Sequence, residues 1–278
     1  MKIPHPNHPE GGYYMEDDLY KNLVPLLKRI EKDKDVVAVY VGSPGDGKST
    51  KAQQDAYLLD PNLSLSNIHW SYEDYVLHSL RLKEAGKSKG TALIHDEGKE
   101  TLSSASMLNL RTKKFMQYLY ENRSLNMFQF LLSGDFFDLP RTLVMQRVLY
   151  MVYVHEEGEF QNGYFKFYNR DNLRKLYLKG KAERDMKAYP YNLRGTFPKF
   201  YTVDEAAYRK KKADDMVKDK YIVEKKKDRL GIKDILYWLW DRRAYTTDQQ
   251  VMDITGIWPS QYFSIKKQYK LQESKEII

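Results

Sequence analysis

The chain has 278 residues, and 42% of them are apolar, which is enough for a buried core and excludes global disorder. It has no cysteine, so disulfides, thiolate metal sites and cysteine nucleophiles are all excluded. The net charge of +8 suits a polyanionic partner, although a solvated lysine-rich helix explains the densest basic run, residues 209–229, at least as well.

The sequence carries no sign of a membrane segment. No apolar run approaches the ~20 residues that span a bilayer. The first residues also lack the basic-then-apolar layout of a signal peptide. We therefore expect a soluble, cytoplasmic protein with no membrane span.

Apolar patterning and capping residues predict helices that alternate with strands. The helices are expected over residues 17–32 with a break at Pro25, 48–59, 72–84 with Ser71 as the cap, and 112–122. The strands are expected over residues 36–41, 68–70, 91–95, 128–132, 148–155 and 164–168. Such alternation implies crossover connections, so we predict an α/β fold with a mostly parallel sheet flanked by helices. The last strand, which follows a turn at residues 161–163, predicts an antiparallel extension, and residues 181–203 are expected to be irregular.

A glycine-rich segment directly after the strand over residues 36–41 fits the pattern G-x-x-x-x-G-K-S/T of a phosphate-binding loop. Glycines let backbone N–H groups turn inward around a phosphate, and the next helix points its positive N-terminus at the same place. Lys48 is expected to reach the β- and γ-phosphates of ATP, and the Ser49 hydroxyl is expected to hold Mg²⁺. The residues expected to bind the nucleotide are Gly42, Ser43, Pro44, Gly45, Asp46, Gly47, Lys48, Ser49 and Thr50. This segment predicts a P-loop NTPase domain of the RecA/ASCE-like type.

Two adjacent acids, Asp96 and Glu97, end the buried strand over residues 91–95. Ligands of open α/β sheets bind beyond the carboxyl ends of the strands, so these acids and the phosphate loop should share one edge. Asp96 is expected to hold Mg²⁺, and Glu97 to orient and deprotonate the attacking water. An acidic pair that only caps the next helix is the alternative.

Further candidates follow the next strand. Ser133 ends that strand and is expected to sense the γ-phosphate or the attacking water, while a plain turn over residues 133–135 explains it equally well. Asp135 is a weaker candidate, because an acid beside phosphates repels them. Charge that develops on the transferred phosphoryl group also needs a second cation, in cis or from a neighbouring subunit. The arginines available for this role are Arg111, Arg123, Arg141 and Arg147.

The order of these pieces over residues 36–155 resembles the DNA-translocating ATPases of the FtsK/HerA type, with the Zot-like ATPases of phages close to that pattern. The stretches that carry the resemblance are VYVGSPGDGKST, IHWSYEDYVLHSL before ALIHDEG, and YENRSLNMFQFLLSGDFFDLPRTLVMQRV. The resemblance implies arginine-finger positions at Arg123 and Arg147 and a sensor at Ser133. It also implies a homo-oligomeric ring, commonly a hexamer, with DNA in the central channel. In such a virus- or plasmid-encoded protein the location would be the host cytoplasm.

The last fifty residues read as a helix-turn-helix unit. Thr247 and Gln250 form a capping box for its second helix, and Pro259 suits the first turn of the third. The third helix can enter a major groove, with lysines on phosphates and glutamine on base edges. The residues expected to contact DNA are Gln261, Ser264, Lys266, Lys267 and Lys270. A helical lid or an oligomerisation module with a basic face is the alternative.

These observations predict four parts: a leader and helix (1–35), an ATPase domain (36–203), a charged connecting helix (204–230) and a DNA-binding helix-turn-helix (231–278). The function predicted is that of an ATPase that acts as a DNA motor in translocation, packaging or transfer. An AAA+-like helicase loader, a nucleotide-switched transcription regulator and a small-molecule kinase are the alternatives.

Overall fold

The computed structural model describes residues 1–96, 110–157, 163–215, 236, 240, 247–255 and 258–276. The chain divides into two compact units, residues 1–215 and residues 216–278. Within the described residues, no helix combines the length and the apolar character that a membrane span requires.

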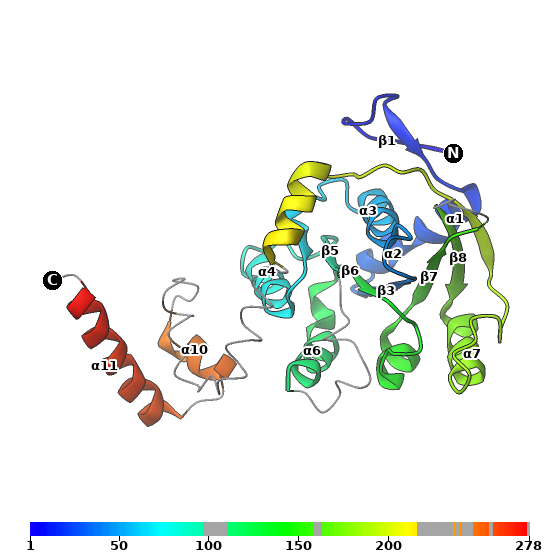
Figure 1. Ribbon diagram of the computed structural model, residues 1–278. Coiled ribbons are helices and arrows are strands. Elements are labelled where there is room, and N and C mark those ends of the chain that lie inside the picture. Colours follow the sequence, from blue (N-terminus) through cyan, green and yellow to red (C-terminus); the bar gives the residue numbers. More distant parts are fainter. Residues whose placement is uncertain are drawn as a thin grey trace. The chain divides into compact units, whose positions relative to one another are not determined.

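The first unit is built on a seven-stranded mixed sheet (Figure 1). Its strands are β3 (Val36–Val41), β4 (Ile68–His69), β5 (Ala92–His95), β6 (Phe128–Ser133), β7 (Tyr150–His155), β8 (Tyr164–Asn169) and β9 (Leu193–Thr196). They lie in the order β4-β5-β6-β3-β7-β8-β9. The pairs from β4 to β7 are parallel, whereas β7–β8 and β8–β9 are antiparallel. The predicted parallel core and its antiparallel extension are both confirmed.

Strand β9 was not expected, because residues 181–203 were predicted to be irregular. That prediction is wrong at Leu193–Thr196, which pairs with β8 from Phe167 to Tyr164. The four residues include a glycine and an exposed arginine, so they carry neither the apolar run nor the alternation that marks a strand.

Helices cover both faces of the sheet. The helices of the first unit are α1 (Asp17–Leu23), α2 (Pro25–Glu31), α3 (Lys48–Leu59), α4 (Tyr72–Glu84), α6 (Leu110–Glu121), α7 (Arg170–Gly180) and a segment over residues 205–215. Buried side chains of α1, α2 and α3 belong to the core on one face, and those of α4, α6 and α7 to the core on the other. A small separate sheet joins β1 (Lys2–Pro4) to β2 (Gly12–Tyr14).

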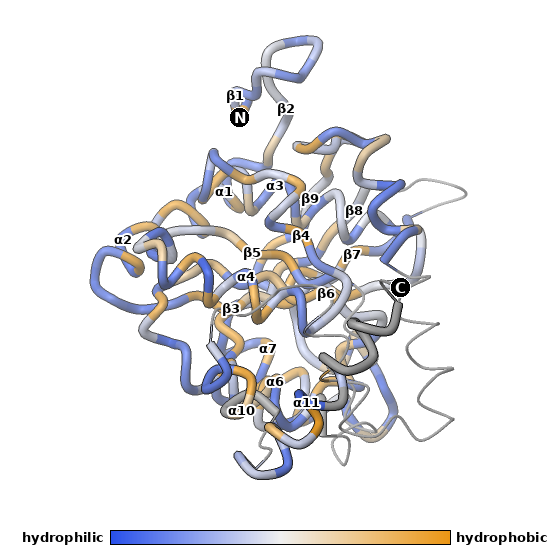
Figure 2. The backbone as a smooth tube through the Cα atoms, turned by 90° about the vertical axis from the view of Figure 1, so that its left-hand side faces the viewer, coloured by the Kyte–Doolittle hydropathy of each residue, from blue (hydrophilic) through white to orange (hydrophobic). Residues whose placement is uncertain are grey.

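The central strand β3 contributes to both cores. Its alternate residues Val36, Ala38 and Tyr40 pack on one side, and Val37, Val39 and Val41 pack on the other. All six are buried, as expected for a parallel strand covered on both faces. Figure 2 shows the same pattern, with apolar colour along the central strands and polar colour in the surface loops.

Local signals fixed several helix ends. Ser71 accepts a hydrogen bond of 3.0 Å from the Asp74 backbone N–H and so caps α4. Pro25 separates α1 from α2, since it cannot donate a backbone hydrogen bond within a helix. Leu19 and Leu23 of α1 are fully buried and belong to the core on one face of the sheet.

The described part of the second unit contains α10 (Asp248–Thr255) and α11 (Pro259–Glu276). Thr247 and Gln250 exchange hydrogen bonds of 3.3 Å, which confirms the capping box. A small apolar cluster joins the two helices to Leu236, with Val251 and Tyr262 at its centre.

Candidate functional site

The segment between β3 and α3 forms a tight glycine-built loop. Gly42, Gly45 and Gly47 all have positive φ, at +150°, +97° and +95°, which favours glycine at each position. Gly42 also lies so close to β7 that an added Cβ would fall 2.2 Å from the Val154 carbonyl oxygen. The tight passage from β3 to α3 therefore depends on glycine at these positions.

The loop satisfies its own polar groups. The Lys48 ammonium donates a hydrogen bond of 2.8 Å to the Ser43 carbonyl, and the Ser43 backbone N–H donates one of 2.6 Å to Asp46 Oδ2. Asp46 is largely buried in the loop. Its carboxylate oxygen accepts a hydrogen bond from a backbone N–H of the kind that donates to a phosphate oxygen in such loops. An anionic side chain thus occupies part of the cradle.

Asp96 lies beside the first turn of α3. The Ser49 hydroxyl donates a hydrogen bond of 2.8 Å to Asp96 Oδ2, although β6 lies between the strands that precede these two residues. Asp96 is only 2% exposed, and its backbone N–H donates to the His69 carbonyl at 2.8 Å. The phosphate loop and the first acid therefore meet at the carboxyl edge of the sheet.

A third oxygen joins this pair. The Tyr208 hydroxyl, from the segment over residues 205–215, donates a hydrogen bond of 2.6 Å to the same Asp96 Oδ2. Burial and the Asp96 carboxylate raise the pKa of Tyr208, so its hydroxyl stays a donor. No local sequence pattern indicates this contact, because Tyr208 stands beside a lysine-rich run 112 residues from Asp96.

The donor set suits Mg²⁺. One carboxylate and one hydroxyl at a phosphate loop are the ligands that Mg²⁺ takes in such sites, with phosphate oxygens and water completing the shell. Among the described residues, no group of three histidine or acidic side chains could enclose a metal ion. Ser49 and Asp96 would hold Mg²⁺ together with a bound nucleotide.

A buried ion pair anchors α3 below the loop. The Lys51 ammonium contacts Asp55, and the Tyr40 hydroxyl donates 2.7 Å to the same carboxylate. Both charged side chains are at most 1% exposed. Burial lowers the pKa of Lys51 and raises that of Asp55. Sequence reasoning did not single out this pair.

Ser133 ends β6 and His95 ends β5, so both lie at the carboxyl edge of the sheet. Ser133 pairs in register with Val41, one residue before the loop, and its hydroxyl donates 3.2 Å to the Asp135 carbonyl. Glu97 lies outside the described residues. His95 is fully buried, as expected for a packing residue, and burial lowers its pKa to about 4.

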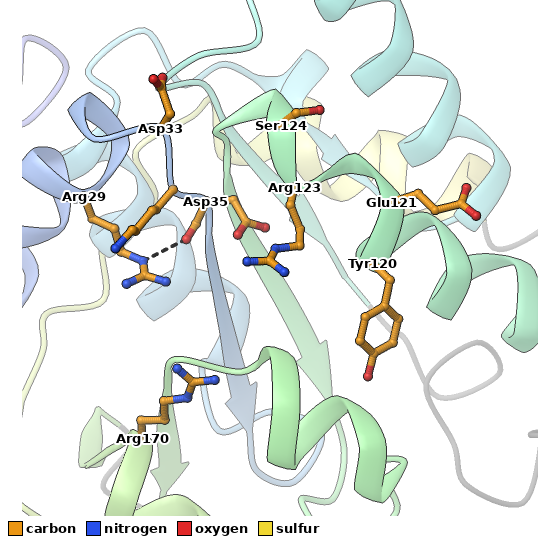
Figure 3. A pocket seen from close by; sticks show the side chains of 9 residues that line it. Arg29, Asp33, Asp35, Tyr120, Glu121, Arg123, Ser124 and Arg170 are labelled. Atoms are coloured by element: carbon orange, nitrogen blue, oxygen red, sulfur yellow. Dashed lines mark hydrogen bonds between the residues drawn. The ribbon is translucent and has the colours of Figure 1, made fainter.

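Two arginine-finger candidates lie at the opposite, amino edge of the sheet. Arg147 forms a buried ion pair with Asp35, the residue before β3. Arg123 precedes β6 and, with Arg29 and Arg170, lines a pocket of about 640 Å³ that contains Asp35 (Figure 3). The six residues of β3 span five steps of about 3.3 Å, so this edge lies about 17 Å from the edge that carries the phosphate loop. Within one chain, neither arginine therefore lies at the loop.

Three candidates from the sequence remain: Asp135, Arg141 and Arg111. Asp135, which follows β6, forms an ion pair of 2.6 Å with Arg184. Arg141 is exposed, and the Arg111 side chain lies outside the described residues.

The predicted DNA contacts on α11 divide into two groups. Gln261, Ser264 and Lys267 are exposed. Lys266, expected to face outward, instead forms an ion pair with Asp248 and lies 5.8 Å from the Tyr262 ring centre. The Lys270 side chain lies outside the described residues.

The strand–loop–helix cradle, with a buried acid from a parallel strand beside its serine, defines a P-loop NTPase-like α/β fold. No protein-family model and no curated protein sequence matches the chain. Several solved structures do match, among them the following three.

The N-terminal domain of zonular occludens toxin from Neisseria meningitidis is 14% identical, covers 49% of this chain and 84% of its own, and has a TM-score of 0.38. The genome packaging NTPase B204 from Sulfolobus turreted icosahedral virus 2, in complex with sulfate, is 14% identical over 50% of this chain and 92% of its own, with a TM-score of 0.37. The FIGL-1 AAA domain in complex with ADP is 14% identical over 73% of this chain and 88% of its own, with a TM-score of 0.38.

Proposed function

We propose that this chain is a magnesium-dependent ATPase that works as a DNA motor, in packaging, translocation or transfer. The observation that carries the proposal is the hydrogen bond from Ser49 to Asp96, directly below the glycine loop. This hydrogen bond brings together the phosphate loop and the acid, which are both needed to bind and hydrolyse a nucleotide. The sequence resemblance to FtsK/HerA-type ATPases, together with the order of strands around β3, supports the RecA/ASCE-like branch of the fold.

The residues divide the chemistry among them. Lys48 neutralises the β- and γ-phosphates once it leaves the Ser43 carbonyl, and backbone N–H groups of the loop bind phosphate oxygens. Ser49 and Asp96 would hold Mg²⁺, which would stabilise the charge that develops on the transferred phosphoryl group. Glu97 accepts the proton of the attacking water, and Ser133 orients that water.

Arg123 is the better candidate for the arginine finger. Its side chain is exposed at the amino edge and forms no hydrogen bond or ion pair with another described residue. Arg147 is held by Asp35 and is 7% exposed. Because Arg123 precedes β6 at the amino edge, and the phosphate loop lies at the carboxyl edge of the same sheet, it would act on a neighbouring subunit. This supports the homo-oligomeric ring.

The second unit is proposed to be a helix-turn-helix that holds DNA. Its capped α10, the proline at the start of α11 and the exposed Gln261 and Lys267 favour this role.

The test is ATP hydrolysis by the full chain with and without double-stranded DNA, alongside the mass in solution with a non-hydrolysable nucleotide. We expect turnover that rises with DNA, a nucleotide-dependent oligomer, and a Glu97→Gln variant that binds ATP without turnover. Turnover indifferent to DNA, with binding to one operator sequence, would point to a transcription regulator instead. Stimulation only by a helicase would point to a loader.

A further inference from the structure

Tyr208 contacts the magnesium site without belonging to any nucleotide-binding motif. Its hydroxyl lies 2.6 Å from Asp96 Oδ2, the oxygen that also accepts from Ser49 at 2.8 Å. Both Tyr208 and Asp96 are nearly fully buried, at 3% and 2% exposure. Three oxygens from three distant parts of the chain therefore meet where the metal is expected.

The segment that carries Tyr208 is firmly docked on the sheet domain. Asp204 caps it by accepting 2.6 Å from the Ala207 N–H. The Tyr208 ring packs between Trp70 and Tyr201, at 5.3 Å from each ring centre. One turn later, Lys211 donates to the carbonyls of two residues around β4, Leu65 and Ile68, at 2.9 and 2.6 Å. Residues 205–215 (the yellow helix in Figure 1) are thus held in place while Tyr208 holds Asp96.

These two hydrogen bonds use the full accepting capacity of Asp96 Oδ2. A carboxylate oxygen has about two lone-pair sites, and here two hydroxyl hydrogens occupy them. A magnesium ion that Ser49 and Asp96 Oδ2 hold together, directly or through a water, needs one of those sites. Ser49 is itself expected to bind the metal and stays at the site. Tyr208 is the donor that has to give way.

We propose that Tyr208 is a latch on the empty magnesium site: its hydroxyl binds Asp96 when the metal is absent and releases it when Mg²⁺ enters with nucleotide. The inference rests on the proposed function of this site. Residues 205–215 lead in sequence directly into residue 216, where the second unit begins. Release of Tyr208 therefore loosens the segment through which the ATPase unit connects to the second unit.

The test compares Tyr208→Phe with Tyr201→Phe. Each removes one hydroxyl and keeps the ring, but only Tyr208 bonds to Asp96. The first readout is binding of a fluorescent, non-hydrolysable ATP analogue at increasing Mg²⁺. The Tyr208 hydroxyl and Mg²⁺ compete for Asp96, and a hydrogen bond to a charged group changes such an equilibrium about tenfold. Tyr208→Phe should therefore need about tenfold less Mg²⁺ to reach half of the metal-dependent gain in affinity for the analogue. Tyr201→Phe should match the unmodified chain.

The second readout is amide hydrogen exchange over residues 205–215. In the unmodified chain, exchange there should rise when Mg²⁺ is added with the analogue, compared with the analogue in a chelator. In Tyr208→Phe, exchange should already be high and should not respond to the metal. An unchanged Mg²⁺ requirement, or metal-independent exchange in the unmodified chain, overturns the latch while leaving nucleotide binding intact. Failure of the unmodified chain to bind the analogue at any Mg²⁺ concentration overturns the proposed function and the latch together.

Discussion

The Ser49 hydroxyl lies 2.8 Å from Asp96 Oδ2, although the two residues stand 47 positions apart and follow strands that are not neighbours. Strands β3 and β5 both run parallel to β6, so their carboxyl ends reach the same edge. The first turn of α3 then carries Ser49 across to Asp96.

Asp96→Asn tests the metal role of this contact. The amide keeps the size of the side chain and one acceptor oxygen, but it removes the negative charge that attracts Mg²⁺. We expect the Mg²⁺ concentration for half-maximal ATP hydrolysis to rise at least tenfold. A variant that keeps the original Mg²⁺ requirement would remove Asp96 from the metal site.

Asp46→Asn should strengthen nucleotide binding. The Asp46 carboxylate sits in the loop and accepts from the Ser43 N–H at 2.6 Å, so it competes with phosphate oxygens and repels them. Removing one negative charge beside the phosphates should improve the free energy of ATP binding by about 1 kcal/mol or more. This predicts a roughly fivefold to tenfold lower dissociation constant for ATP. Asp33→Asn, the same change at the exposed amino edge, is the control and should leave binding as it is. Weaker binding by Asp46→Asn would show that the carboxylate supports the loop instead.

Arg147 and Arg123 should behave differently in unfolding experiments. Arg147→Met leaves Asp35 charged and buried, which costs about 3–5 kcal/mol of unfolding free energy. Arg123→Met changes an exposed side chain and should cost less than about 0.5 kcal/mol. Denaturant titration measures both. If Arg147→Met unfolds at the original midpoint, the Asp35 pair is not structural and Arg147 returns as a finger candidate.

Lys267 and Lys266 should differ in DNA binding. Lys267 is exposed and available to a phosphate, whereas Lys266 is paired with Asp248. Lys267→Ala should weaken binding and lower the salt dependence by about one released ion. Lys266→Ala should have the smaller effect. Equal binding by all variants, and by a chain that lacks residues 231–278, would contradict a DNA-binding role for the second unit.

Much of the sheet domain could be predicted from the sequence because its signals are local. Helices α3 and α4 begin and end at the predicted residues: a glycine-to-lysine transition starts one, and the Ser71 cap starts the other. The buried strands are short runs of apolar residues, and the phosphate loop follows directly from its glycines.

The features that could not be predicted depend on distant partners. Arg147 has the position of a finger in the sequence, yet Asp35, 112 residues away, holds it in an ion pair. Strand β9 exists only because β8 offers an edge, and Tyr208 reaches Asp96 from a run that looks like a solvated helix. In each of these contacts the two partners lie too far apart in the sequence for a local pattern to contain both.

The most direct test of the nucleotide site is equilibrium binding of ATP by Lys48→Ala. Lys28→Ala, an exposed lysine on α2, serves as the matched control. Loss of the Lys48 ammonium should weaken ATP binding at least a hundredfold, because this cation neutralises the phosphates, while Lys28→Ala should bind like the unmodified chain. ATP binding that survives Lys48→Ala undiminished would contradict the assignment of this loop as the nucleotide site.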